Sequence, residues 1–235
     1  MKNPRNTFQQ QVLDRIGQDI CSGRYPAGQT LPSELELCER FAFSRIVIRE
    51  AVKSLAAKGM LEVRRKFGTL VLDRSHWNLF DPEIIAWRAQ VTGIDQEMSR
   101  DLLELRRIVE PAAARLAAVR AGDKDREAIA AAFDAMKQAV VGSGDYVVAD
   151  LAFHAAIISA CGNQFLRQMQ NAVSAILRTG FEVISQKAGG PAFTLPMHER
   201  LCLAIEQGDA DAAGQAVLQL IDQAEQDLHE ALAKA

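Results

Sequence analysis

Apolar residues recur at helical intervals near the start of the chain. Val12, Ile16 and Ile20 are four residues apart, so their side chains share one face of a helix. The serine and glycine that follow interrupt this pattern with residues that favour helix ends. The pattern predicts a first helix over residues 7–21.

Two further segments carry helix-capping signals. Ser33 has a glutamate three residues later, which is the capping-box arrangement, and it predicts a short helix over residues 34–40. Ser44 is a second N-cap and predicts a helix that continues to Lys58. Two short helices joined by a tight turn are typical of a helix-turn-helix.

A small hairpin is expected after these helices. The β-prone runs at 60–64 and 69–72 flank a short loop at 65–68. A hairpin in this place would form the wing of a winged helix-turn-helix. We therefore expect a winged helix-turn-helix domain over residues 1–75.

Helical periodicity dominates the rest of the chain. Residues 76–96 mix turn residues with large aromatics and are expected to form a linker that packs on a domain. Helices are then expected at 97–121, 123–141, 145–161, 163–187, 194–207 and 209–233. Residues 97–235 should thus form an antiparallel helical bundle, with Pro111 kinking its first helix. The predicted fold class is mainly α.

Charge separates the two expected domains. Residues 1–75 hold 13 Lys/Arg against 8 Asp/Glu, which gives +5, and residues 76–235 hold 14 against 22, which gives −8. Their sum is the formal net charge of −3. Because a basic surface attracts polyanions, only the first domain is expected to face a nucleic acid.

Three features of the sequence bear on its compartment. No apolar run reaches the roughly 18 residues that a membrane span needs. The first ten residues contain no export signal. The four cysteines lack the close spacing of a zinc ribbon or a disulfide scaffold, so they are expected to be reduced thiols. Together these features predict a cytoplasmic protein with no membrane partner.

The helix that begins at Ser44 has two distinct faces. Its apolar stripe consists of Ile48, Val52 and Leu55, and its cationic stripe consists of Arg45, Arg49 and Lys53. An arginine near the start of a recognition helix can donate two hydrogen bonds to guanine O6 and N7, while a neighbour neutralises a phosphate. We expect Arg45 and Arg49 in these roles. A cationic stripe alone is more often the ordinary solvated face of a helix.

The expected wing concentrates positive charge at its tip. Arg64, Arg65 and Lys66 are consecutive, and Gly68 and Thr69 follow closely. A cationic hairpin tip suits the DNA backbone or the minor groove, and a glycine permits close approach. The wing is therefore expected to supply affinity more than specificity.

Three residues of the expected bundle form a candidate metal site. Asp150 and His154 are four residues apart, so both project from one face of their helix. His198 would complete a carboxylate–imidazole–imidazole set for a divalent cation, zinc or similar, with positions left open for an anionic oxygen ligand. Such a site would bind a carboxylate with a neighbouring hydroxyl. The spacing alone also fits a surface or capping pair.

The N-terminal pattern resembles the GntR family of bacterial repressors. The matching segments, within residues 8–72, are Leu31 to Leu37, Ser44-Arg45, Ile48 to Ala51, Leu55, Gly59 and Gly68-Thr69. The resemblance implies binding to double-stranded operator DNA, with Ser33 and Ser44 joining the cationic residues at the interface. Leu35 stands where family members often carry a DNA-contacting arginine, and Lys66-Phe67 replaces a glycine-containing wing tip.

Residues 97–230 resemble the FCD-type effector domain of the FadR branch of that family. The residues that carry the resemblance are Glu104-Leu105-Arg106, Glu110-Pro111, Ala114, Asp150, Phe153-His154, Gly162-Asn163, His198, Gly208-Asp209 and Ala212-Ala213. The resemblance implies that Asp150, His154 and His198 bind a divalent metal together with a third histidine. By register that histidine would lie at Leu220, so the ligand set is incomplete in this chain.

The same resemblance implies an effector site. Arg106 is expected to pair with the carboxylate of the effector, for which its bidentate geometry is suited. Glu110 would orient Arg106 from one turn away, and Asn163 is expected at the same site. The aromatic segment 77–87 resembles the linker of the sugar-acid regulators in this branch, which implies an aldonic acid or a related sugar acid as effector.

We therefore expect a homodimeric transcription regulator, a repressor that a small carboxylate releases from DNA, and not an enzyme. One alternative is a metal-dependent enzyme that uses Asp150, His154 and His198 to activate water. The sequence has neither an evident general base beside these residues nor a His-Glu-x-x-His motif. A second alternative keeps the DNA-binding domain but makes the metal itself the signal, or a purely structural element.

Overall fold

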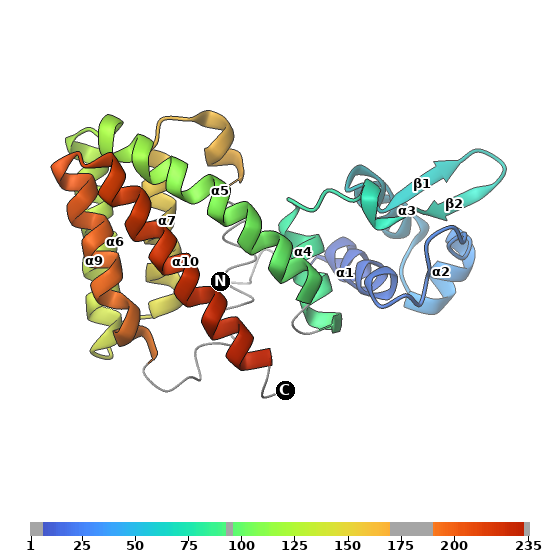
Figure 1. The fold of residues 1–235 in the computed structure, drawn as a ribbon. Helices are drawn as coiled ribbons and strands as arrows, with labels where there is room; N and C mark the ends of the chain where they lie inside the picture. The colour runs from blue at the N-terminus through green and yellow to red at the C-terminus, as the bar shows by residue number, and fades with distance from the viewer. Residues whose placement is uncertain (1–6, 93–95, 170–189, 233–235) are drawn as a thin grey trace. The chain divides into compact units, whose positions relative to one another are not determined.

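The computed structural model describes residues 7–92, 96–169 and 190–232. The chain divides into two compact units, Met1–Gly93 and Ile94–Ala235. Helices make up most of both units, and the described residues contain one two-stranded sheet (Figure 1). The prediction of a mainly α fold is confirmed.

The first unit begins with three helices and a hairpin. These elements are α1 (Phe8–Cys21), α2 (Glu34–Phe41), α3 (Arg45–Ala57), β1 (Leu61–Arg64) and β2 (Gly68–Val71). Thr7, Ser33 and Ser44 cap the three helices with their side-chain oxygens, and Ser33 forms the full capping box with Glu36. The apolar stripes of α1 and α3 are buried against each other in one core.

The hairpin is fixed at its base and free at its tip. The strands are antiparallel, with Leu61 paired to Val71 at the base and Arg64 paired to Gly68 at the tip. Leu61 and Val71 are buried in the core of the unit. The Leu31 N–H donates to the Thr69 carbonyl at 2.7 Å, which adds a third extended segment beside β2. Residues 65–67 alone make up the tip.

The segment predicted as a linker packs on this first unit. It contains the short helix η1 (Arg74–His76) at its start and then α4 (Pro82–Thr92). Trp77 and Trp87 are buried in the same core as α1 and α3. Gly17 lets the Trp87 ring lie directly on α1, because a Cβ at Gly17 would stand 2.5 Å from that ring. Lys58 adds an ion pair to Asp81 at 2.6 Å.

The second unit is a helical bundle. Its named helices are α5 (Gln96–Arg120), α6 (Asp123–Val140), α7 (Tyr146–Ala160), α9 (Gly190–Gln207) and α10 (Ala210–Leu232), shown in green to red in Figure 1. α5 packs on α10, α6 on α7, and α9 on α10 and α6. The core is rich in alanine, which lets helices approach closely, and Phe133, Phe153 and Met136 fill the wider spaces.

Most predicted helices of this unit agree with the structure within one or two residues. The predicted helix at 194–207 was too short, because α9 begins at Gly190 and places Pro191 in its first turn, where a proline costs no backbone hydrogen bond. Residues 164–169 are helical, and the remainder of the predicted helix at 163–187 lies outside the described residues. Within the described ranges, no helix combines the length and the apolar character that crossing a membrane requires.

The turn between α2 and α3 holds backbone strain that a substitution can release. Ala42 ends α2 with φ of +58°, a left-handed conformation that side chains with a Cβ disfavour. We expect Ala42→Gly to raise the free energy of unfolding by about 0.5–1 kcal/mol. Denaturant unfolding followed by tryptophan fluorescence measures this, because the two tryptophans of the chain lie in the core of the first unit.

Ala89 provides the matched control for this substitution. It lies inside α4, where Ala89→Gly should lower the free energy of unfolding by about 1 kcal/mol. Equal destabilisation by both glycines would show that the Ala42 conformation carries no strain.

Candidate nucleic-acid interface and metal centre

The third helix exposes the predicted cationic stripe. Ser44 begins α3, and its Oγ accepts a hydrogen bond from the Val47 N–H at 3.5 Å. The predicted apolar stripe is buried, which fixes the orientation of the helix. Arg45, Arg49 and Lys53 are all exposed. The recognition face of α3 therefore consists of side chains that are open to a partner.

Two of these three cations have acidic neighbours. Arg49 donates to both carboxylate oxygens of Glu34, with Nε at 3.0 Å and Nη2 at 2.9 Å. These hydrogen bonds are the main cause of the lowered pKa of Glu34. Lys53 Nζ lies 2.8 Å from Glu50. Exposed pairs of this kind are weak, so an incoming phosphate can replace the carboxylates. Within the described ranges, Arg45 forms no salt bridge.

The recognition face also contains an apolar side chain that the sequence analysis missed. Ile46 is 76% exposed and lies beside Arg45 at the start of α3. A signal for it existed, because Ile46 falls outside the apolar stripe that the helical period defines. On a recognition helix, an exposed aliphatic side chain suits the methyl group of thymine. Leu35 on α2 is likewise exposed.

The predicted wing residues differ in their surroundings. Arg64 donates to Glu62 at 2.8 and 3.0 Å, whereas Arg65 and Lys66 are exposed and form no salt bridge with a described residue. Lys66 has φ of +72° and Gly68 has φ of +89°, which turn the chain sharply. The Thr69 carbonyl accepts a hydrogen bond from the Leu31 N–H at 2.7 Å.

The serines predicted to touch DNA both serve as helix caps. Ser33 Oγ accepts from the Glu36 N–H at 3.3 Å and lies 2.8 Å from the Glu36 carboxylate. Ser44 caps α3 in the same manner. Both side chains remain exposed at the starts of their helices. Any phosphate bound there would also meet the positive end of a helix dipole.

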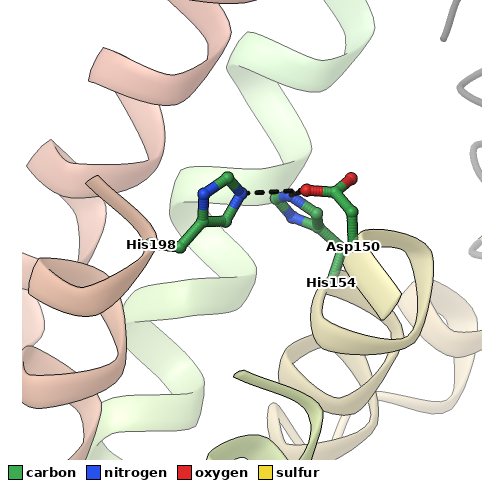
Figure 2. A group of neighbouring side chains, drawn as sticks. All are labelled: Asp150, His154 and His198. Atoms are coloured by element: carbon green, nitrogen blue, oxygen red, sulfur yellow. Dashed lines mark ion pairs between the residues drawn. The ribbon is translucent and has the colours of Figure 1, made fainter. Parts of the chain in front are cut away.

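Two helices of the second unit bring the predicted metal ligands together. α7 carries Asp150 and His154, and α9 carries His198 (Figure 2). The His198 Nε2 lies 3.0 Å from Asp150 Oδ1, and the His154 Nε2 lies 3.9 Å from the same oxygen. One ligand atom from each residue falls within 4.8 Å of the others. This group, here called the Asp150 cluster, is buried.

Hydrogen bonds orient His198 toward Asp150. The His198 Nδ1 lies 2.9 Å from the Thr194 carbonyl, and since a carbonyl only accepts, Nδ1 must carry the proton. This leaves Nε2 directed at the carboxylate, as in metal sites whose histidines are held by a backbone acceptor. The Tyr146 hydroxyl lies 3.0 Å from Thr194 Oγ1, so α7 and α9 are joined twice near the cluster.

The electrostatics of the cluster favour a bound cation. Burial raises the pKa of Asp150, but the hydrogen bond from His198 and the nearby His154 outweigh it and hold that pKa below its usual value. Burial lowers the pKa of His154, which favours the neutral imidazole that metals bind. Asp150 Oδ2 is buried without a hydrogen-bond partner. A divalent cation between these three residues would satisfy that oxygen, so the donor set fits such an ion.

The position expected for a fourth ligand is part of the core. Leu220 is 6% exposed and packs among the apolar residues of the second unit. A cation in the cluster would therefore have three protein ligands and open coordination positions. This is the arrangement of sites that admit a small ligand rather than of closed structural sites.

A buried ion pair lies beside the cluster. Arg106 Nε donates to Glu110 Oε1 at 2.7 Å, and both residues are buried on α5. Glu110 Oε2 is 3.9 Å from His154 Nδ1, so the pair adjoins the cluster. The predicted orientation of Arg106 by Glu110 is thus present, but the guanidinium already has an acidic partner.

Asn163 has a structural use in this protein. Its side-chain oxygen accepts from the backbone N–H of Phe165 at 2.9 Å and of Leu166 at 3.4 Å. It therefore caps the helical residues that follow. No described hydrogen bond connects Asn163 with Arg106 or with the Asp150 cluster. Its predicted contact with an effector remains a prediction.

Comparison with known proteins supports the two-part organisation. The family model "Bacterial regulatory proteins, gntR family" matches residues 8–71, and the model "FCD domain" matches residues 101–223. The galactonate operon transcriptional repressor of Escherichia coli (strain K12) is 36% identical over 212 residues, which cover 89% of this chain and 92% of that protein. The putative L-lactate dehydrogenase operon regulatory protein of the same strain is 31% identical, with 88% of this chain and 81% of that protein covered.

A solved structure shares the fold. The structure described as "Lar controls the expression of the Listeria monocytogenes agr system and mediates virulence" matches with a TM-score of 0.70 at 17% identity, over 97% of this chain and 99% of that chain. The family models and the curated relatives describe regulators, which argues against the metal-dependent enzyme. The chain belongs to the GntR family and is a DNA-binding transcription regulator with an FCD effector domain.

Proposed function

We propose that this chain is a homodimeric repressor that a sugar acid, bound at a divalent cation in the second unit, releases from operator DNA. The observation that carries the proposal is the buried Asp150 cluster with its unpartnered oxygen. The galactonate repressor of Escherichia coli, which is 36% identical, supports a sugar acid as the effector class. Its relatives support operator DNA as the partner.

The recognition face supplies both kinds of base contact. Arg45, which is exposed and free of salt bridges among the described residues, donates to guanine in the major groove. Ile46 packs against a thymine methyl, and Arg49 exchanges Glu34 for a phosphate. Lys53, with Arg64, Arg65 and Lys66 of the wing, adds attraction to the DNA backbone.

The second unit recognises its effector through charge. Asp150, His154 and His198 would hold the cation, which supplies positive charge and open positions for a carboxylate oxygen and a neighbouring hydroxyl. The Arg106–Glu110 pair is neutral as a whole, and Asp150 cancels one of the two charges of the cation. One positive charge is left, which matches a single carboxylate.

Effector binding also changes the partner of Glu110. A carboxylate that pairs with Arg106 displaces Glu110, which then needs another hydrogen-bond donor because it is buried. His154 Nδ1, at 3.9 Å, is near enough to become that donor when Nε2 binds the cation. Through this exchange of hydrogen bonds, the position of α5 would depend on whether the effector is bound.

A regulator that responds to the metal itself is a second candidate. The observation in its favour is that a cation alone satisfies Asp150 Oδ2 and needs no organic ligand. The two candidates differ in what releases DNA. A sugar acid acts only on metal-loaded protein in the first case, and the metal suffices in the second.

The role of Arg45 is tested on DNA. A duplex selected by the wild-type protein from a randomised pool serves as the probe, and fluorescence anisotropy at fixed salt gives the affinity. We expect Arg45→Ala to weaken binding by about 10- to 100-fold, since a bidentate contact to guanine contributes about 1–3 kcal/mol. Arg100→Ala, at an exposed arginine of the second unit, is the control and should bind as wild type. Equal binding by both variants would exclude Arg45 from base recognition.

The metal site is tested by composition and stability. We expect His198→Ala to lose the bound divalent metal in elemental analysis and to lose the rise in melting temperature that added zinc produces in wild type, because one of three protein ligands is removed. His229→Ala is the control, since His229 is exposed on α10. Retention of metal by the His198 variant would contradict the assignment.

Glu110 tests the charge argument. Replacing it with glutamine leaves Arg106 without an anionic partner, so the site gains one positive charge. We expect Glu110→Gln to shift the ratio of affinities for galactarate over galactonate by about tenfold toward the dicarboxylate, measured by calorimetry on zinc-loaded protein. Melting temperature with zinc confirms that the variant is folded. An unchanged ratio would mean that Arg106 and Glu110 do not face the effector.

A further inference from the structure

An aromatic ring is exposed at the tip of the wing. Phe67 is 78% exposed, more than any other large apolar side chain of the described residues. Leu61 and Val71 anchor the base of the hairpin in the core. The hairpin therefore holds its tip, with Phe67, in a defined position at the surface. Water contact of this much apolar surface is unfavourable for the free protein.

The surroundings of Phe67 are cationic and strained. Arg65 and Lys66, which precede it, are exposed and form no salt bridge with a described residue. Lys66 adopts φ of +72°, which costs a residue with a Cβ of order 1 kcal/mol, and Gly68 follows at φ of +89°. The chain thus presents a ring directly after two exposed cations at the narrow end of a hairpin.

The chemistry of this tip selects its partner. An apolar surface patch for another protein would need apolar neighbours, whereas the residues next to Phe67 are charged or glycine. Duplex DNA offers the matching combination, because its phosphates attract the cations and its stacked bases accept a ring. The wing belongs to the same unit as the recognition face of α3.

We propose that Phe67 enters the minor groove of the operator and inserts between two base pairs, bending the duplex. The insertion occurs at a pyrimidine–purine step, because these steps unstack most readily. Phe67 thereby selects a deformable step without hydrogen bonding to any base. The inference rests on the proposed binding to operator DNA.

The test compares affinity, bending and salt dependence. Wild type, Phe67→Ala and Phe67→Leu are measured on the duplex selected from a randomised pool, with donor and acceptor dyes at its ends to report the bend and 2-aminopurine at the expected step to report unstacking. We expect Phe67→Ala to bind about tenfold more weakly, to lose the bend and the 2-aminopurine signal, and to keep the salt slope of wild type. Phe67→Leu, which keeps an apolar wedge, should retain most of the bend.

Two controls make the outcome specific. Phe165→Ala removes a ring of similar exposure, 71%, from the second unit and should change nothing on DNA. Lys66→Ala removes a cation from the same tip and should reduce the salt slope by about one. A Phe67→Ala protein that bends DNA as wild type does, with or without a loss of affinity, overturns the insertion. Wild-type protein that selects no duplex overturns the proposed DNA binding instead.

Discussion

The side chain of Asp150 is buried, with 1% exposure, and the polar groups packed around it in the second unit are there to stabilise its charge. A buried carboxylate is costly unless positive charge or hydrogen-bond donors meet it. α9 supplies His198 at 3.0 Å, and the Thr194 carbonyl fixes the ring that does so. Asp150 Oδ2 still has no hydrogen-bond partner among the described residues. A cation bound there would stabilise this buried oxygen.

The same constraint extends to α5. Arg106 and Glu110 are buried together, and each removes the uncompensated charge of the other. A ligand with one carboxylate would have to take over a positive charge that is already paired, or to meet the proposed cation. Both routes disturb groups that touch His154 or Glu110. Under the proposed function, recognition of an acid would therefore require rearrangement of these buried charges.

Local signals in the sequence were sufficient for much of the fold. The capping box at Ser33 and the apolar stripe of α3 depend on neighbours within one or two turns, so the chain itself specifies them. The Asp150 cluster required more, because His198 lies on a different helix from Asp150 and His154. Helical spacing predicts only the pair on α7. His198 is a candidate because its imidazole would complete the ligand set, and the resemblance to the FCD-type domain implies the same three residues.

Contacts between distant elements could not be predicted. Arg49 meets Glu34 because α2 and α3 pack together, and nothing in the spacing of 15 residues indicates that pair. The close approach of Trp87 to Gly17 likewise exists only in the folded unit. Asn163 is different, since asparagine ahead of a helix is a common N-cap and this use was open to prediction.

Backbone strain distinguishes the two parts of the DNA-binding surface. In the described chain, Ala42 and Lys66 are the residues other than glycine with positive φ. Ala42 lies between buried Phe41 and half-buried Phe43, whose ring contacts Phe8 at 5.5 Å, so packing on both sides enforces and offsets its conformation. Lys66 has no such packing, because the tip of the wing is exposed. The positive φ values of Lys66 and Gly68 instead form the sharp turn that joins β1 to β2, so hairpin closure, and not side-chain packing, holds the backbone of the tip in this conformation.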